Sequence, residues 1–496
     1  MDAHRPFPQT TGPHPDASQQ AYGRSPTVNI VSLSLCYPSP SAPGAGRFVQ
    51  QRLHALHLSH TVRVICPLLR SPRTAIRGSS LEAIRGSTPE AIPGSAVGPA
   101  FQPVKRQAGK PVPHALGPPP VWYVPMPYIP RLTQPINPHL YARAVYPLLS
   151  EWAASGQVDL IDAHFCWPDG VAAARLARRL GLPFTITLRG VLKRYANHLT
   201  KRRSIIGALR EADALIAVSQ SLKAEAVKLG IHADRIHVIP NGVDTAIFKP
   251  GDRNQARHAL GRSPDETLLI TVSHLCRRKG IHRVLRMLPE LIRRGTGRKA
   301  RQTTPCKPCS AVSRATPPPS RDLRYVVIGA DGAEGRFHLH LTRLVKRLGL
   351  LDHVTFTGAL PPAGVVQWLQ AADLFVLATS NEGCCNALCE ALATGLPVVT
   401  TDVGGNAELV HPCRGRVVPY GDDRAFLQAI QSTLDDRTAS AGRSSRTTRT
   451  WNLVAAETAA ALQSTLPATG RPTTPLLGCS LETSRVRRAD HPVVTH

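Results

Sequence analysis

The sequence predicts an α/β protein built from two Rossmann-like, doubly wound domains that face a cleft. Short apolar runs alternate with helical segments along the chain, and this alternation starts again near residue 268. Leu374 to Leu377 is a continuous apolar run, as expected of a parallel strand that is covered on both faces. A chain of 496 residues with 42% hydrophobic residues is long and apolar enough for two or three domains.

The composition also indicates that part of the chain does not pack into these domains. The sequence holds 45 prolines and 37 glycines, and only 5% of its residues are aromatic. An octapeptide repeat starts at Ala75, Ala83 and Ala91, and its unit is too short to stack into a solenoid. We therefore expect disorder in a leader, two insertions and a tail, at residues 1–27, about 69–118, about 296–321 and 466–496.

The formal net charge of +27 narrows the possible partners. Such a charge suits nucleic acid, an anionic membrane surface or an anionic substrate. No nucleic-acid motif with interleaved aromatic residues is present, so nucleic acid is not expected. We prefer an anionic donor or an anionic membrane surface.

The expected location is the cytoplasm, with the protein peripheral at the inner face of the membrane. No apolar run reaches the roughly 18 residues of a spanning helix, and residues 1–27 have no apolar signal core. The eleven cysteines are scattered, which suits reduced thiols. Cys306 and Cys309 form a lone Cys-x-x-Cys pair, and a zinc site usually needs four ligands, so no metal site is expected.

Local signals place several helix starts. Asn137 is a predicted cap for a helix from Pro138 to Ala154, and Pro168 is predicted to open a helix that ends at Leu180. Asn386 is a predicted cap for the short helix after the strand at 374–377.

The loop between that strand and that helix is the predicted centre of the site. In a doubly wound sheet, ligands bind beside the loops at the carboxyl ends of the strands. This loop carries Glu382 and Gly383, and the helix start after it offers backbone N–H groups to an anion such as a diphosphate. Glu390 lies one turn into the helix, so the two carboxylates can face one crevice.

This segment resembles the donor-binding signature of glycosyltransferase family 4, a retaining family with the GT-B fold. The family pattern has Glu-Gly, seven residues between two glutamates, Gly-x-Pro-Val-Val and Gly-Gly-x-x-Glu. All of these occur here in order, the last two at residues 395–399 and 404–408. The resemblance implies transfer of a sugar from a nucleotide-sugar to a hydroxyl acceptor with retained anomeric configuration, and it implies no cofactor and no metal.

The resemblance also implies roles for residues around the loop. Glu390 would bind the nucleotide ribose, and Glu382 is expected to act in catalysis and to hold the donor sugar. The sugar-binding set is completed by residues at and after the loop glycine, namely Gly383, Cys384, Cys385 and Asn386. The departing phosphate oxygen, rather than a side chain, would take the proton of the acceptor.

A basic loop after the strand at 269–273 matches the diphosphate-binding segment of the family. Lys279 and Gly280 agree with the family pattern, whereas Ser273 and His274 stand where relatives have Gly-Arg. The arginine contact is then missing or has moved to Arg277 or Arg278. Lys279 is expected to be catalytic, since a cation stabilises the charge that builds on the leaving diphosphate.

Four positions in the first half of the chain complete the candidate site. Gly46 matches the glycine-containing loop after the first strand. His164, which we expect to be catalytic, matches a histidine that contacts the donor near the reacting centre. Arg189 stands where many relatives have histidine, and an arginine can grip an anionic acceptor or a phosphate. Asn241 lies in a turn that suits an interdomain hinge. An ordinary turn at Gly46 and a structural histidine at His164 remain open alternatives.

By the same resemblance we divide the chain into an acceptor domain at 28–240, a donor domain at 241–450 and a crossover helix at 451–465. The expected partners are a nucleotide-sugar and a carbohydrate or lipid-linked acceptor, in exopolysaccharide, capsule or lipopolysaccharide assembly. Two alternatives stay open. One is a catalytically degenerate nucleotide-sugar-binding GT-B protein, and the other is a basic polyanion-binding protein on a Rossmann scaffold.

Overall fold

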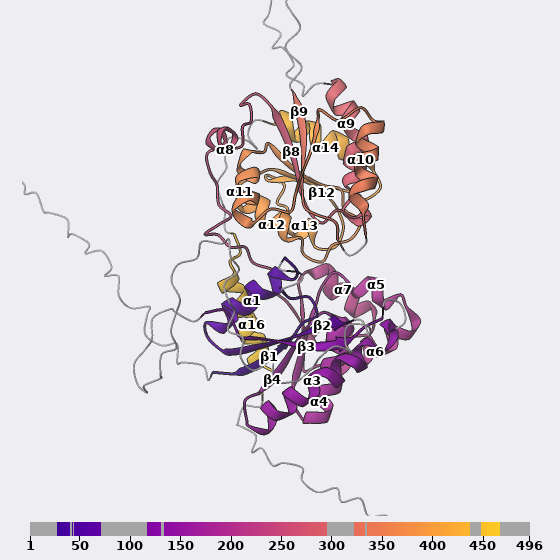
Figure 1. The fold of residues 1–496 in the computed structure, drawn as a ribbon, viewed down its shortest axis with the longest axis vertical. Helices are drawn as coiled ribbons and strands as arrows, with labels where there is room; N and C mark the ends of the chain where they lie inside the picture. The colour runs from indigo at the N-terminus through magenta and orange to yellow at the C-terminus, as the bar shows by residue number, and fades with distance from the viewer. Residues whose placement is uncertain are drawn as a thin grey trace, which may run out of the picture.

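A computed structural model of the chain shows two α/β domains stacked on one another (Figure 1). It describes residues 27–39, 42, 44–70, 117–129, 133–294, 322–332, 335–436 and 448–466. Apart from a few residues at their edges, the predicted leader, the two predicted insertions and the predicted tail lie outside the described residues. The Cys306 and Cys309 pair lies outside them as well.

The first domain is built on a seven-stranded sheet in which every neighbouring pair of strands is parallel. Its strand order is β3-β2-β1-β4-β5-β6-β7. The strands are β1 (Asn29–Leu33), β2 (Thr61–Arg70), β3 (Val121–Pro127), β4 (Leu160–His164), β5 (Phe184–Leu188), β6 (Ala214–Ala217) and β7 (Ile236–Val238). The helices are α1 (Arg47–His57), α3 (Asn137–Ala154), α4 (Val171–Leu180), α5 (Leu192–Ala196), α6 (Leu199–Glu211) and α7 (Gln220–Lys228).

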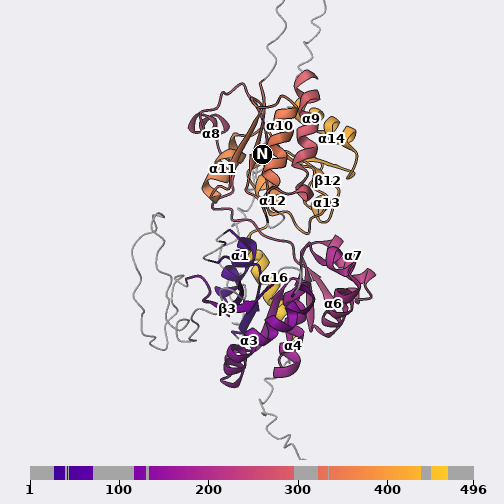
Figure 2. The same cartoon turned by 45° about the vertical axis from the view of Figure 1, so that its right-hand side comes forward.

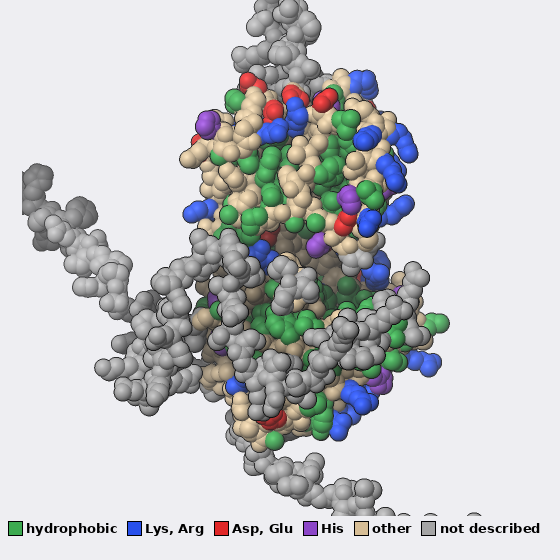
Figure 3. All heavy atoms as spheres, in the orientation of Figure 1, with side chains coloured by type: hydrophobic (Ala, Val, Ile, Leu, Met, Phe, Trp, Pro, Cys, Tyr) green, Lys and Arg blue, Asp and Glu red, His purple; other side chains and the backbone are tan. Residues whose placement is uncertain are grey.

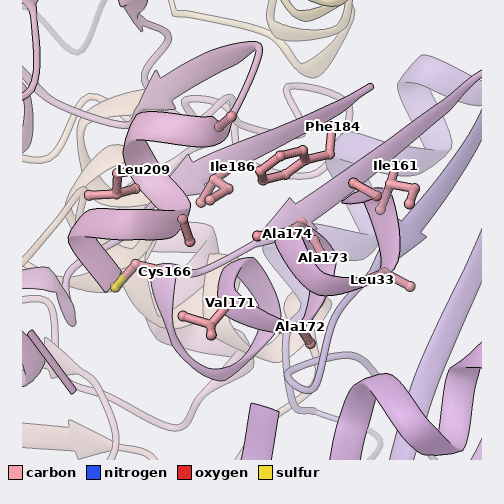
Figure 4. Close-up of a cluster of buried hydrophobic side chains, with 14 of the residues drawn as sticks. Leu33, Ile161, Cys166, Val171, Ala172, Ala173, Ala174, Phe184, Ile186 and Leu209 are labelled. Atoms are coloured by element: carbon pink, nitrogen blue, oxygen red, sulfur yellow. The ribbon is translucent and has the colours of Figure 1, made fainter. Parts of the chain in front are cut away.

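Both faces of this sheet are buried, which explains why its strands read as continuous apolar runs. Helices α3, α4 and α6 cover one face, where Ile161 and Ile186 pack into the main core of the domain (Figure 4). Helix α1 covers the other face, where it packs on strand side chains such as Ile30 of β1 and Val64 of β2.

The second domain has a six-stranded parallel sheet in the order β10-β9-β8-β11-β12-β13. Its strands are β8 (Thr267–Val272), β9 (Leu323–Ile328), β10 (Val354–Gly358), β11 (Leu374–Leu377), β12 (Val398–Thr401) and β13 (Gly415–Val418). One face is covered by α9 (Ile281–Arg294), α10 (Phe337–Arg347) and α14 (Asp423–Asp435). The other face is covered by α8 (Arg253–Ala259), α11 (Pro362–Ala371) and α12 (Asn386–Ala393), and the short helix α13 (Asn406–Leu409) follows β12.

The last described helix, α16 (Trp451–Gln463), returns to the first domain. Trp451 and Val454 join the core on the α1 side of the first sheet. Helices α16 and α1 lie side by side in both views (Figures 1 and 2). The final segment of the chain therefore completes the core of the domain that is built first.

Three local predictions were wrong. Helix α3 begins at Asn137 itself, and α12 begins at Asn386 itself, so neither asparagine is the cap and no side chain caps either helix. Residues 166–170 form a separate wide turn before α4, so Pro168 does not open that helix. Strand β2 extends to Arg70 and pairs with β3 from Val64 onward.

Candidate functional site

The candidate site lies at the topological switch point of the second sheet. Strands β8 and β11 are neighbours in this sheet, although β9 and β10 come between them in the chain. Their carboxyl ends lead into a basic loop at residues 273–280 and an acidic loop at residues 378–385. Ligands of open α/β sheets bind outside the carboxyl ends of the strands at such a point.

An ion pair joins the two loops. Lys279 Nζ lies 2.6 Å from Glu382 Oε1, and the same carboxylate oxygen accepts a hydrogen bond of 3.0 Å from Thr379 Oγ1. The side chains are 13% and 8% exposed, so this pair is largely withdrawn from water. Both side chains belong to the predicted site, and their catalytic roles stay a prediction.

Backbone contacts hold the two loops in register. The amide of Ser380 donates to the carbonyl of Arg278 at 2.9 Å, and Arg278 Nη1 donates to the carbonyl of Asn381 at 3.3 Å. Gly280 has a φ of 74°, and a Cβ there would lie 1.9 Å from the carbonyl oxygen of Ala378. Only glycine allows this approach, which places Lys279 over the acidic loop. Arg277, by contrast, is exposed.

Lys279 stays charged in this environment. Burial lowers the pKa of its ammonium group, but the attraction of the Glu382 carboxylate outweighs that effect and raises the pKa above the ordinary value. A positive charge is therefore held at the rim of the sheet, beside the start of α12.

Helix α12 presents the second predicted carboxylate. Burial raises the pKa of Glu390 to about 7, against the opposing attraction of Arg47 in α1. The charge that acts on Glu390 is thus one of the first domain, and no ion pair of the described residues joins Glu390 to Lys279. Cys385 caps the helix through its backbone, and the Cys389 thiol hydrogen bonds to Cys384 and lowers the pKa of that thiol.

The acidic loop also forms the seam with the first domain. Asn381 Nδ2 donates to the carbonyl of Gly190 at 3.1 Å. A Cβ on Gly190 would lie 2.8 Å from the amide nitrogen of Gly383, so the two backbones touch. Asn241 Nδ2 donates to Asn386 Oδ1 at 2.7 Å, which connects the interdomain turn to the first residue of α12.

A second contact across the seam joins α13 of the second domain to α7 of the first. The Glu408 carboxylate accepts hydrogen bonds from the backbone amides of Gln220 and Ser221, at 2.7 and 2.9 Å. These amides belong to the first turn of α7, where a negative charge is favoured. The second domain thus caps a helix of the first.

Three of the four predicted residues in the first half of the chain, Arg189, His164 and Asn241, belong to one buried network. Arg189 Nη1 donates to Asn241 Oδ1 at 3.2 Å, and Arg189 Nη2 lies 3.3 Å from His164 Nδ1. On its other side, His164 Nε2 lies 3.2 Å from Asp162 Oδ2, although the two groups are not aligned as a hydrogen bond. His164 is fully buried between these neighbours, so in this arrangement it faces protein groups rather than the cleft.

The network carries excess positive charge. Burial lowers the pKa of His164 to about 4 despite the nearby carboxylate, so the ring is neutral at pH 7. Burial and repulsion from Arg52 lower the pKa of Arg189 to about 9, which still leaves it charged. Arg52 is fully buried, and its guanidinium nitrogens have no hydrogen-bond partner among the described residues. Asp162 is therefore the one carboxylate between two arginines.

Gly46 lies at the start of α1, apart from the ion pair. It has a φ of 62°, and a Cβ there would lie 1.9 Å from the carbonyl oxygen of Cys36. This packing explains the glycine, and it leaves a contact with substrate as a prediction.

Sequence reasoning missed several residues of the site, namely Thr379, Asn381, Arg52, Asp162 and the carboxylate of Glu408 as a cap. Two of them carried a signal, Glu408 as the last residue of the Gly-Gly-x-x-Glu pattern and Asp162 as the first residue of an Asp-x-His sequence. Thr379 contacts Glu382 within one loop and Arg52 lies near Asp162 within one domain, so only the contact of Asn381 depends on the meeting of the two domains.

Other surfaces of the described chain add little to this site. A cavity of about 470 Å³ lies between α3 and α4 and shares no residue with the site. In the described ranges, no group of three or more His, Cys, Asp or Glu side chains is arranged to hold a metal ion. Among the described helices, none combines the length and the apolar character needed to cross a membrane.

Two parallel Rossmann-like sheets in domains that meet at a seam define the GT-B class of fold. The Lys279–Glu382 pair lies at the switch point of the second sheet, and the surface is hollowed between the domains (Figure 3). Comparisons with known proteins agree. Residues 43–247 match the family described as Glycosyltransferase Family 4, and residues 266–436 match Glycosyl transferases group 1. The chain therefore belongs to the family 4, group 1 glycosyltransferases.

Curated relatives carry related names. A D-inositol 3-phosphate glycosyltransferase of Catenulispora acidiphila is 30% identical over 56% of this chain and 63% of the relative. This chain spans 46% to 63% of the length of the Catenulispora relative and of two further D-inositol 3-phosphate glycosyltransferases, from Nocardia farcinica and Acidothermus cellulolyticus. A putative teichuronic acid biosynthesis glycosyltransferase of Bacillus subtilis is 27% identical over 81% of this chain and 88% of the relative.

Solved structures share the fold. Sucrose-phosphate synthase from Thermosynechococcus elongatus has a TM-score of 0.61 at 19% identity, covering 88% of this chain and 98% of that one. HepE of Anabaena, solved in complex with UDP, has a TM-score of 0.57 at 20% identity, covering 88% of this chain and 95% of that one.

Proposed function

We propose that this chain is a retaining glycosyltransferase that moves a sugar from a nucleoside diphosphate sugar to a hydroxyl group of a carbohydrate or lipid-linked acceptor. The observation that carries the proposal is the Lys279–Glu382 pair at the switch point, 2.6 Å long and beside the start of α12. A cation and free helix-start amides at one point suit a diphosphate. UDP in a structure of the same fold supports this donor class.

The reaction would run as follows. The acceptor oxygen attacks the anomeric carbon on the face that the diphosphate leaves, and the bond from that carbon to the diphosphate oxygen breaks. The acceptor proton passes to the departing phosphate oxygen, so sugar, proton and diphosphate are all accounted for. Lys279 and the first amides of α12 stabilise the charge on the diphosphate, and Glu382 orients both Lys279 and the donor sugar.

Glu390 has a separate place in this proposal. The half-buried carboxylate of Glu390 on α12 can accept hydrogen bonds from the two ribose hydroxyls of the nucleotide. With its pKa raised to about 7, it is only partly ionised at neutral pH in the empty protein. Nucleotide binding would then favour the ionised form.

We further propose that the product belongs to a cell-surface polysaccharide, in exopolysaccharide, capsule or lipopolysaccharide assembly. The name of the teichuronic acid relative, which matches over most of this chain, supports this pathway class. The proposed place of action is the inner face of the membrane, reached from the cytoplasm. Exposed cationic side chains on α5 and α6 suit an anionic surface, namely Lys193, Arg194, Arg202 and Arg203.

The test is a screen of nucleotide-sugars by thermal shift, followed by assay of sugar release or transfer from each donor that binds. A donor that binds only the folded state raises the melting temperature. We expect at least one UDP-, GDP- or ADP-sugar to do so, and we expect Lys279→Ala and Glu382→Ala to remove turnover. Lys346→Ala and Glu151→Gln, at exposed positions on α10 and α3, are the matched controls.

The outcomes separate the candidate functions. Donor binding without turnover would indicate the degenerate nucleotide-sugar-binding protein. Polyanion binding that survives Lys279→Ala but falls steeply with salt, together with no response to any nucleotide-sugar, would contradict the transferase proposal.

A further inference from the structure

A small pocket lies at the carboxyl edge of the first sheet, outside the site described above. Its volume is about 140 Å³, well below the roughly 300 Å³ at which sites for drug-sized ligands begin. Such a pocket takes one small polar unit rather than a length of chain. Its wall includes Leu35 after β1, Tyr128 after β3 and Trp167 after β4, and it is closed by Tyr195 and Lys201 from α5 and α6.

Lys201 is the unusual member of this pocket. The residue is only 8% exposed, and no carboxylate of the described chain forms an ion pair with it. Its Nζ has one hydrogen-bond contact, 3.5 Å from Gln134 Oε1. Burial and the nearby Arg194 lower the pKa of this ammonium group. A buried charge without a counter-ion is costly, so the pocket is incomplete without an anion.

Two aromatic rings hold the ammonium group in place. Lys201 Nζ lies 4.8 Å from the centre of the Tyr195 ring and 5.5 Å from the centre of the Trp167 ring. Trp167 is 6% exposed, and the wide turn at residues 166–170 fixes it after Phe165, which adopts a φ of 86°. Cation–π contacts of this kind offset part of the desolvation of the lysine.

The remaining polar wall suits hydroxyl groups. Asn137 is 7% exposed, and its Oδ1 has no hydrogen-bond partner among the described residues. Gln134 adds a second side-chain amide to the pocket. The pocket thus combines aromatic rings that can stack on the apolar faces of a sugar with amides that can bind its hydroxyl groups. Its lysine can pair with an anion.

The pocket also lies on the edge of the sheet that faces the second domain. Tyr195 follows Gly190 by five residues, and the backbone of Gly190 touches that of Gly383 in the donor loop. The ring of Phe165, two residues before Trp167, lies 5.9 Å from the guanidinium of Arg189. A sugar held in this pocket therefore lies beside the seam at which the donor loop is placed.

We propose that this pocket holds the acceptor through a sugar ring that bears an anionic group, a carboxylate or a phosphate, which Lys201 pairs with. The proposal rests on the transferase function given above, because it names the class of acceptor for that reaction. In this proposal Lys201 selects anionic over neutral sugars, and Trp167 and Tyr195 stack on the sugar ring.

The test is calorimetric titration of the full chain, with and without UDP, with three probes. These are 4-nitrophenyl β-D-glucuronide, glucose 6-phosphate and the neutral 4-nitrophenyl β-D-glucoside. We expect at least one of the anionic probes to bind ten or more times more tightly than the glucoside. Lys201→Met should remove that preference and leave binding of the glucoside within about twofold. The control is Lys193→Met, at an exposed position of α5, which should change neither.

The result also identifies the anion, since the tighter of the two anionic probes shows whether carboxylate or phosphate is preferred. Equal binding of anionic and neutral probes by the wild-type chain would overturn the proposal, and so would equal effects of Lys201→Met and Lys193→Met. Should Lys201→Met fail to fold, Lys201→Gln keeps a hydrogen-bonding group toward Gln134 and serves in its place. UDP titrated into the same samples tests the donor function separately, because no residue of this pocket belongs to the donor loops.

Discussion

Glu390 should make the second domain less stable as the pH rises through neutrality. Burial raises its pKa from 4.5 to about 7, so the folded protein binds its proton more tightly than the unfolded chain does. The stabilising effect of protonation is full below pH 4.5, and it is lost as the pH rises from there to above 7. The difference of about 2.5 pKa units corresponds to roughly 3 kcal/mol at 1.36 kcal/mol per unit.

The substitution Glu390→Gln keeps the shape of the side chain and removes its titration. Melting of wild type and variant, compared by calorimetry at pH 5 and pH 8, should show the wild type losing stability relative to the variant. For a domain of this size, roughly 3 kcal/mol corresponds to a relative change of roughly 6–12 °C. Glu151→Gln, at an exposed position, corrects for the pH dependence of the rest of the chain. A difference between wild type and Glu390→Gln that does not change with pH would refute the reasoning.

Three more perturbations test the site and the seam. Lys279→Met should lower kcat by about 10²–10³ with a smaller change in KM, as measured with the donor found by thermal shift, and an unchanged kcat would remove Lys279 from the chemistry. Glu408→Ala should cost about 1 kcal/mol because it removes the acceptor of two first-turn amides of α7, whose Ser219 cap stays in place, and it should raise hydrogen exchange at Gln220 and Ser221. Unchanged exchange there would mean that the domains do not keep this contact in solution. Asp162→Asn should destabilise the first domain by about 3–5 kcal/mol, because it leaves the buried Arg52 and Arg189 without their carboxylate. Urea denaturation measures this loss, and Asp234→Asn, at an exposed position of the same domain, is the control.

The two sheets could be predicted because their signals are local. Each strand buried on both faces is a short apolar run, and each loop at its carboxyl end carries residues whose spacing is visible in the chain. The pairing of Lys279 with Glu382 follows from the topology, since the strands that precede their loops are neighbours at the switch point. A doubly wound sheet brings such loops together whatever their separation in the sequence.

The contacts between the domains could not be predicted in the same way. Asn381 meets Gly190 across 191 residues, and Glu408 meets Gln220 across 188 residues, so no spacing rule connects them. The same contacts explain the wrong cap at Asn386. Its side-chain oxygen, which a capping residue would give to its own helix, accepts from Asn241 of the interdomain turn instead.

The return of α16 to the first sheet limits how this protein can be divided. The chain crosses between the domains twice, and the two crossings run together, with the amide of Val243 donating to the carbonyl of Arg449 at 2.8 Å. A truncation that keeps only residues before the second domain would leave the apolar side of α1 without Trp451 and Val454. An excised first domain that is to stay in solution should therefore carry residues 448–466 grafted after the first crossing, so that the core is closed within a single shortened polypeptide.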